Sequence, residues 1–108
     1  QVVLIARRVW YYSDNDEAAF FEWLHKIACI EKYEGALDAL NLYVNEARVD
    51  AGSLYELIAL FRRYAVDMSQ LRVFDRDEFA TWFRSPKAHW FKEVFEEMGR
   101  TNFKEVKQ

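Results

Sequence analysis

The architecture of this chain depends on a segment near its middle, Ile30-Glu-Lys-Tyr-Glu-Gly-Ala-Leu-Asp-Ala-Leu-Asn-Leu-Tyr-Val-Asn45. In its second half, leucine and valine alternate with polar and aromatic residues, which is typical of a strand with one buried face. Glu34-Gly35-Ala36 supplies a turn between that strand, Leu37 to Asn45, and a shorter strand before it, Ile30 to Tyr33. We therefore expect a β-hairpin. Gly35 to Leu40 could instead begin a helix, and the sequence leaves this alternative open.

The residues before the hairpin predict a strand and then a helix. Val2 to Tyr12 is rich in β-branched and aromatic residues and contains no breaker, so we expect a long strand in the centre of a sheet. Ser13 to Glu17 offers a capping oxygen and first-turn acids, and apolar residues at helical spacing follow. The first helix is expected from Asp14 to Lys26.

The residues after the hairpin predict a second helix and another strand. Ser53 and Glu56 have the spacing of a capping box, and the apolar stripe behind them predicts a helix that ends between Tyr64 and Asp67. Gln70 to Phe74 is expected to form a short strand, with Leu71 and Val73 on one side and Arg72 and Phe74 on the other.

The last third of the chain predicts helical structure. Asp75 and Glu78 repeat the capping-box spacing, and Ser85-Pro86 is expected to start a further helix that Gly99 ends. These helices should bury two aromatic stripes, Phe79, Trp82 and Phe83 in the first and Trp90, Phe91, Val94, Phe95 and Met98 in the second.

The order of these elements defines the expected fold class. Strand, helix, strand, strand, helix, strand is the order of a ferredoxin-like split β-α-β sandwich (β-α-β-β-α-β), here with one or two added C-terminal helices. We therefore predict a single α+β domain over residues 1–99 and a loosely ordered tail over residues 100–108.

The composition favours binding over catalysis. The chain has nine Phe, six Tyr and four Trp, but only two His, one Cys and three Gly. Large rigid rings suit packing and recognition, while the groups that usually carry catalysis or bind metals are scarce. We therefore expect no catalytic residue, no cofactor and no metal. The rings at positions 10, 11, 12, 20, 21 and 23 are too close in sequence to point inward together, so some of them should be exposed.

The charge and the cysteine content indicate a compartment and exclude some partners. Eighteen acidic and fifteen basic residues give a net charge of −3 and no continuous basic stretch, so nucleic acid is not an expected partner. Val2 to Ala6 is too short an apolar run for a signal peptide or a membrane span. The single Cys29 cannot form an intramolecular disulfide and is expected to be buried. A cytoplasmic protein is predicted.

In size, acidity and aromatic content, the whole chain resembles the small immunity or antitoxin proteins of bacteria, including those of contact-dependent growth-inhibition systems. The resemblance lies in this overall character and not in a motif. It implies a protein that binds and blocks a toxin domain.

The expected binding residues combine acidic and aromatic side chains. A protein partner with a cationic cleft would be bound by acids that steer a basic surface and by rings that anchor it. The candidate residues are Tyr12, Asp14, Asp16, Glu34, Asp38 and Tyr43. Two other functions stay open. One is a homodimeric structural or regulatory domain, and the other is a small enzyme or ligand-binding domain that uses Asp75, Asp77 and His89.

Overall fold

The computed structural model describes residues 1–96. In chain order, its elements are β1 (Val2–Arg7), α1 (Asp14–Lys26), β2 (Ile30–Ala36), β3 (Ala39–Val44), the 3-10 helix η1 (Glu46–Arg48) and α2 (Ala51–Arg63), followed by the 3-10 helices η2 (Met68–Phe74) and η3 (Asp77–Phe79), α3 (Ala80–Phe83) and the π-helix η4 (Lys92–Glu96). Met98, Gly99 and the predicted tail lie outside the described residues.

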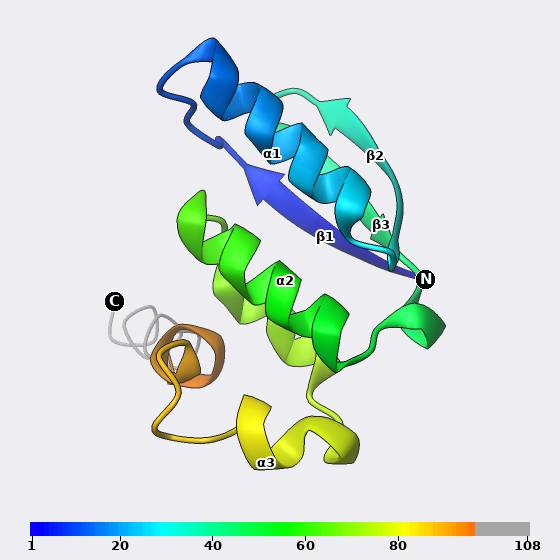
Figure 1. Ribbon diagram of the computed structural model, residues 1–108, viewed down its shortest axis with the longest axis vertical. Helices are drawn as coiled ribbons and strands as arrows, with labels where there is room; N and C mark the ends of the chain where they lie inside the picture. Colours follow the sequence, from blue (N-terminus) through cyan, green and yellow to red (C-terminus); the bar gives the residue numbers. More distant parts are fainter. Residues whose placement is uncertain (97–108) are drawn as a thin grey trace, which may run out of the picture. The chain divides into compact units, whose positions relative to one another are not determined.

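The described residues form two compact units, residues 1–67 and a second unit that begins at Met68. Figure 1 shows the elements of each, with the sheet and helices α1 and α2 in the first unit and α3 in the second. The single domain over residues 1–99 stays a prediction.

The first unit contains a three-stranded antiparallel sheet in the order β1-β3-β2. β3 is therefore the central strand, and the prediction that the first strand is central is wrong. That strand also ends at Arg7 instead of Tyr12. Arg8 adopts a left-handed conformation with φ of 55°, and its N–H donates to the Asp38 carbonyl oxygen at 2.7 Å. The chain leaves the sheet there because this conformation cannot continue a strand.

The predicted hairpin is confirmed, and the helix alternative for Gly35 to Leu40 is wrong. Gly35 pairs with Leu40 and Ala36 with Ala39, so the loop consists of Leu37 and Asp38 alone. The turn thus follows the glycine instead of containing it. Leu42 and Val44 of β3 are buried and the residues beside them are not, which matches the predicted alternation.

Helix α1 has the predicted bounds, and helix α2 begins earlier than predicted. The Ser13 hydroxyl accepts a hydrogen bond from the Asp16 N–H at 3.1 Å and caps α1. At α2 the cap is Asp50, whose carboxylate accepts from the Ser53 N–H at 2.8 Å. The Ser53–Glu56 capping box is therefore wrong. Ser53 is the third residue of the helix, in its first turn, and is buried.

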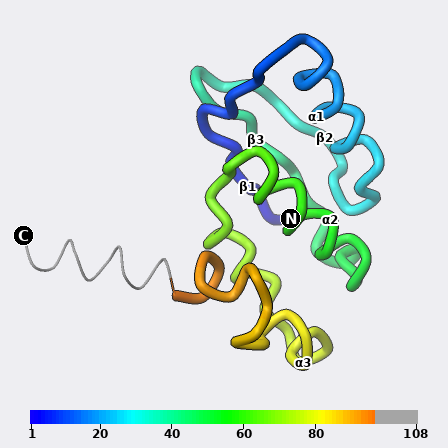
Figure 2. Tube along the Cα trace, turned by 60° about the vertical axis from the view of Figure 1, so that its left-hand side comes forward, coloured from blue at the N-terminus to red at the C-terminus, as the bar shows by residue number. Residues whose placement is uncertain are grey.

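Helices α1 and α2 supply most of the core of the first unit. Figure 1 shows α1 in front of the sheet and α2 alongside it, and the turned view in Figure 2 follows the same path of the chain. Two hydrogen bonds connect α1 with α2 and its C-cap residue. The Trp23 indole N–H donates to Glu56 at 2.8 Å, and the Tyr64 hydroxyl donates to the Asp16 carbonyl at 3.3 Å. The fully buried large side chains of this unit are Leu4, Phe20, Leu24, Leu42, Leu54, Leu57, Ile58, Leu60 and Phe61.

The strand predicted over Gln70 to Phe74 is wrong, because these residues belong to the 3-10 helix η2. Leu71 and Phe74, three residues apart, are both buried, while Val73 is exposed. This is the spacing of a 3-10 turn, in which residues i and i+3 share a face. The protein is thus of mixed α+β class, and the ferredoxin-like arrangement is not confirmed.

The rest of the second unit is less regular than the sequence predicts. The Asp75 carboxylate accepts from Arg84 Nε at 2.7 Å, and η3 has no side-chain cap, so the second capping box is wrong. Phe79 and Phe83 are buried as predicted. The Ser85 hydroxyl does accept from the Lys87 N–H at 3.2 Å, but turns follow Pro86, and the last helix among residues 1–96 is the π-helix η4.

Candidate functional site

Three large side chains are exposed where two loops of the first unit meet. Trp10 and Tyr12, in the loop between β1 and α1, are 71% and 86% exposed, and Leu37, in the loop between β2 and β3, is fully exposed. The loops are held together by the hydrogen bond from the Arg8 N–H to the Asp38 carbonyl. We call these three residues, together with the hollow described next, the loop-end surface. Exposed large apolar side chains mark interaction sites where they form a common patch.

An open hollow of about 370 Å³ lies between the same two loops. Charged side chains from both loops and from α1 contribute to its lining, namely Arg8, Glu17 and Asp38. The other lining residues are Ala6, Val9, Tyr11, Phe21, Leu37, Ala39 and Leu40. The hollow can accept a small apolar side chain and hold charged groups at its border.

The aromatic run Trp10-Tyr11-Tyr12 divides between the interior and the surface. The Tyr11 ring packs against Phe20, with ring centroids 5.6 Å apart, and burial raises the pKa of its hydroxyl. Its two neighbours point away from the core and stay exposed. The prediction that not all of these rings point inward is therefore confirmed.

The charged groups of the loop-end surface are partly used within the fold. Asp38 contacts Arg8 Nε at 2.7 Å and Arg7 at 3.6 Å, and the hydrogen bond from Arg8 lowers the pKa of Asp38. The Asp16 carboxylate accepts from the Tyr12 N–H at 2.9 Å and so fixes the end of the loop. Asp14 is exposed in the first turn of α1. Over residues 7–17 and 37–38, four carboxylates stand against two guanidinium groups, so this surface is net negative.

The six residues predicted to bind a partner fall into two groups. Tyr12, Asp14, Asp16 and Asp38 belong to the two loops of the loop-end surface or to the start of α1. Glu34 and Tyr43 instead lie on adjacent strands, on the sheet face opposite the buried Leu42 and Val44.

The pair on the sheet face is joined by a hydrogen bond. The Tyr43 hydroxyl donates to a Glu34 carboxylate oxygen at 2.8 Å, and this bond raises the pKa of Tyr43. Lys32 lies over the Tyr43 ring at 4.8 Å from its centroid and 4.0 Å from the Glu34 carboxylate. These contacts offset part of the charge of Glu34, as Arg7 and Arg8 do for Asp38, and the pair differs from the other candidates in lying on the sheet face and not in the two loops.

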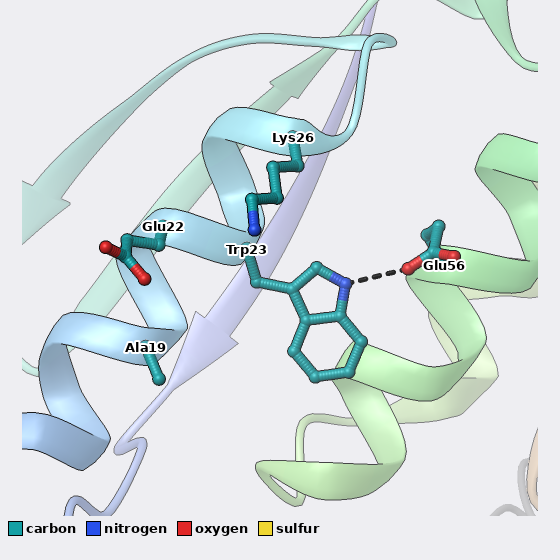
Figure 3. A pocket seen from close by; sticks show the side chains of 5 residues that line it. All are labelled: Ala19, Glu22, Trp23, Lys26 and Glu56. Atoms are coloured by element: carbon teal, nitrogen blue, oxygen red, sulfur yellow. Dashed lines mark hydrogen bonds between the residues drawn. The ribbon is translucent and has the colours of Figure 1, made fainter.

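A second, larger groove of about 580 Å³ lies along α1 and α2. Figure 3 shows the Trp23 ring reaching from α1 towards α2, where its N–H meets Glu56. Ala19, Glu22 and Lys26 of α1 complete the lining. The polar edge of Trp23 is satisfied inside the protein, and opposite charges are mixed along the groove, so we assign this feature to the packing of the two helices.

Asp75, Asp77 and His89, the residues proposed for a small enzyme or ligand-binding domain, form ion pairs or ring contacts with neighbouring side chains. Arg84 binds Asp75 at 2.7 Å and lies 3.9 Å from Asp77, which is fully exposed. His89 is exposed and packs edge-on against the Trp90 ring, with centroids 4.9 Å apart. Within residues 1–96, no group of three or more His, Cys, Asp and Glu side chains is arranged to hold a metal ion.

Cys29 is fully buried, as predicted, and burial raises the pKa of its thiol. This disfavours the thiolate and therefore nucleophilic chemistry at this position. No helix in the part of the chain that the structure describes is long and apolar enough to span a bilayer.

Sequence reasoning missed two features of the loop-end surface. The apolar residues that follow Leu37 predict a strand that includes it, and no turn-forming residue type at this position indicates a loop. The hollow depends on how two loops approach each other, which local sequence does not encode. The crowding of rings around Trp10 was the available signal, although it did not show which rings are exposed.

Searches against protein-family models, curated proteins and solved structures found no match for this chain.

Proposed function

We propose that this chain is a non-catalytic binding protein of the immunity or antitoxin kind, which blocks a toxin domain through the loop-end surface. The exposure of Trp10, Tyr12 and Leu37 in two hydrogen-bonded loops with a net negative charge carries the proposal. Exposed large apolar side chains cost solubility in a free protein, while in a complex they are the usual source of binding energy. The surrounding carboxylates would steer a basic partner and speed its association.

The proposed mechanism is occlusion of a cationic cleft. The carboxylates of Asp14 and Asp16 would approach basic groups at the edge of the cleft, and Trp10 and Tyr12 would pack against its apolar parts. Arg8 holds Asp38 in place at 2.7 Å, so this carboxylate contributes a fixed charge and loses little side-chain entropy on binding.

The experiment compares the two groups of candidate residues in matched variants. The probe is the toxin domain that the proposal expects to be encoded next to the gene for this chain, and the readouts are rescue of growth on co-expression and affinity by calorimetry. Asp14→Asn with Tyr12→Ala is expected to abolish rescue and weaken binding about a hundredfold, by analogy with interface hot spots. Glu34→Gln with Tyr43→Ala is the matched control on the sheet face and should retain both.

The outcomes separate the alternatives. Loss of binding only in the sheet-face variant would move the site from the loop-end surface to the open face of the sheet. If the neighbouring toxin domain does not bind the wild-type chain at all, the immunity proposal fails. An obligate dimer in sedimentation experiments at micromolar concentration, with no partner bound, would favour the homodimeric domain instead.

A further inference from the structure

Leu37 combines two unfavourable properties that the fold of the free protein does not compensate. Its φ is 58°, in the left-handed region, within a two-residue hairpin loop. Glycine and asparagine are preferred at such positions because a larger side chain is strained there. The leucine side chain is also fully exposed, so it contributes no burial in return. A residue that is both strained and exposed indicates a role outside the folding of this chain.

The surroundings of Leu37 resemble one half of a protein interface. The side chain lines the hollow of about 370 Å³, so a projecting apolar group lies next to a recess with both apolar and charged lining residues. Trp10 and Tyr12, in the loop that is hydrogen-bonded to the hairpin loop, are also exposed. Arg8 and Asp38 add a paired charge at the edge, as in interfaces with an apolar centre and a polar rim.

The charge of the loop-end surface indicates whether its binding partner is a second copy of this chain or a different protein. The loop-end surface carries more carboxylates than guanidinium groups, so two copies that meet through it would bring like charges together. Like charges across an interface disfavour association, whereas a basic rim would favour it. The occupant that fits is therefore a different protein with an apolar pocket and basic side chains around that pocket.

We propose that Leu37 is the anchor residue of the loop-end surface, inserting into a leucine-sized apolar pocket of a partner whose rim is basic. The hollow beside it receives an apolar side chain of the same partner. This inference deepens the proposed function and rests on it, because it names the residue and the chemistry of the pocket that the partner must offer.

The first test uses the purified protein alone. Leu37→Gly removes the strain of the left-handed conformation, so its thermal midpoint should rise by about 4 °C. Leu37→Met keeps an apolar side chain of similar volume and should leave the midpoint unchanged. If Leu37→Gly instead lowers the midpoint, the leucine stabilises the fold, and the argument for a role in binding is overturned.

The second test places a photo-crosslinker, p-benzoylphenylalanine, at position 37, 12 or 73 in cells of the source organism. Val73 is the control, because it is apolar and 55% exposed but lies in the other unit. Crosslinks from positions 37 and 12 to one heterologous protein, absent at position 73, are expected. Calorimetry with that purified protein should then show binding weakened about thirtyfold by Leu37→Gly and retained by Leu37→Met.

The other outcomes overturn one or both proposals. A partner that is crosslinked from position 12 but binds Leu37→Gly normally refutes the anchor role and leaves the proposed function intact. A crosslink to a second copy of the chain refutes the heterologous partner. Absence of any crosslink from positions 12 and 37 refutes the anchor role and the proposed function together.

Discussion

The end of helix α2 allows a stability prediction with an internal control. The Val66 N–H donates to the Phe61 carbonyl at 2.9 Å and the Ala65 N–H to the Arg62 carbonyl at 3.4 Å, which is the pattern of a Schellman motif. Ala65, the residue after the C-cap Tyr64, has φ of 56° and is exposed. Glycine is the usual residue at this position because it adopts the left-handed conformation without strain.

Ala65→Gly should therefore stabilise the protein. A left-handed conformation costs a non-glycine residue about 1–2 kcal/mol, and Ala65→Gly removes this cost. The greater freedom of glycine in the unfolded chain destabilises the variant by roughly 0.5–1 kcal/mol and so offsets part of the gain. We expect a net increase of about 0.5–1 kcal/mol in the free energy of unfolding. Ala59→Gly is the matched control, since Ala59 is exposed within the same helix, and there glycine should cost about 1 kcal/mol.

Urea denaturation followed by circular dichroism at 222 nm measures both changes. The urea midpoint should rise for Ala65→Gly and fall for Ala59→Gly, with the slope of the transition unchanged in both. The two variants share one chemical change and one helix, so only the backbone conformation distinguishes them. A decrease in stability of similar size in both variants would refute the Schellman assignment and the strain argument.

Three further predictions concern the charges and the core. Arg72 donates to the carbonyl oxygen of Phe95 and stacks on its ring, so Arg72→Ala should lower the free energy of unfolding by about 1–3 kcal/mol in urea denaturation, and an unchanged midpoint would contradict this contact. The Arg8 guanidinium lowers the pKa of Asp38 below 3.8, so the stabilisation from this pair is complete above the unfolded-state pKa and is lost as the pH falls through the folded-state value. The stability difference between wild type and Asp38→Asn, measured from pH 6 down to pH 2, should therefore shrink below pH 3.8 and with added salt. Phe20 is completely buried, and Phe20→Ala should cost about 3–5 kcal/mol in thermal or chemical unfolding, whereas a loss below about 1 kcal/mol would show that the site is not part of the core.

The elements that the sequence predicted correctly have strong local signals. Helix α1 has its predicted bounds because Ser13 caps it and acids fill its first turn. The hairpin was found because the alternation from Leu40 to Val44 has the period of a strand with one buried face. In both cases, neighbours in sequence determine the structure.

The secondary-structure predictions are wrong where the spacing of apolar residues in a short segment fits both a strand and a helix. Gln70 to Phe74 contains apolar residues at every second position and also at every third, and five residues do not distinguish a strand from a 3-10 helix. Burial of Leu71 and Phe74 shows that the spacing of three applies. Likewise, the strand from Val2 was extended to Tyr12 because a left-handed arginine at position 8 has no sequence signal.

The candidate site was predicted only in part, because it is formed by two loops that are distant in sequence. The chemistry of Tyr12, Asp14, Asp16 and Asp38 predicts a role in binding, and these residues belong to the two loops or to the start of α1. The same chemistry predicts Glu34 and Tyr43, but they lie on the open face of the sheet and are hydrogen-bonded to each other. Their position depends on the register of β2 and β3, which composition does not reveal.

The burial of the single cysteine also provides a direct report on how the first unit opens. Cys29 lies just before β2, and reagents in solvent cannot reach its sulfur while the native packing holds. Alkylation with iodoacetamide, read out by mass spectrometry, therefore counts only the molecules in which the start of the hairpin has separated from the core. The alkylation rate of Cys29 can be measured without an engineered label. It would show whether a bound partner slows local opening or only the unfolding of the whole chain.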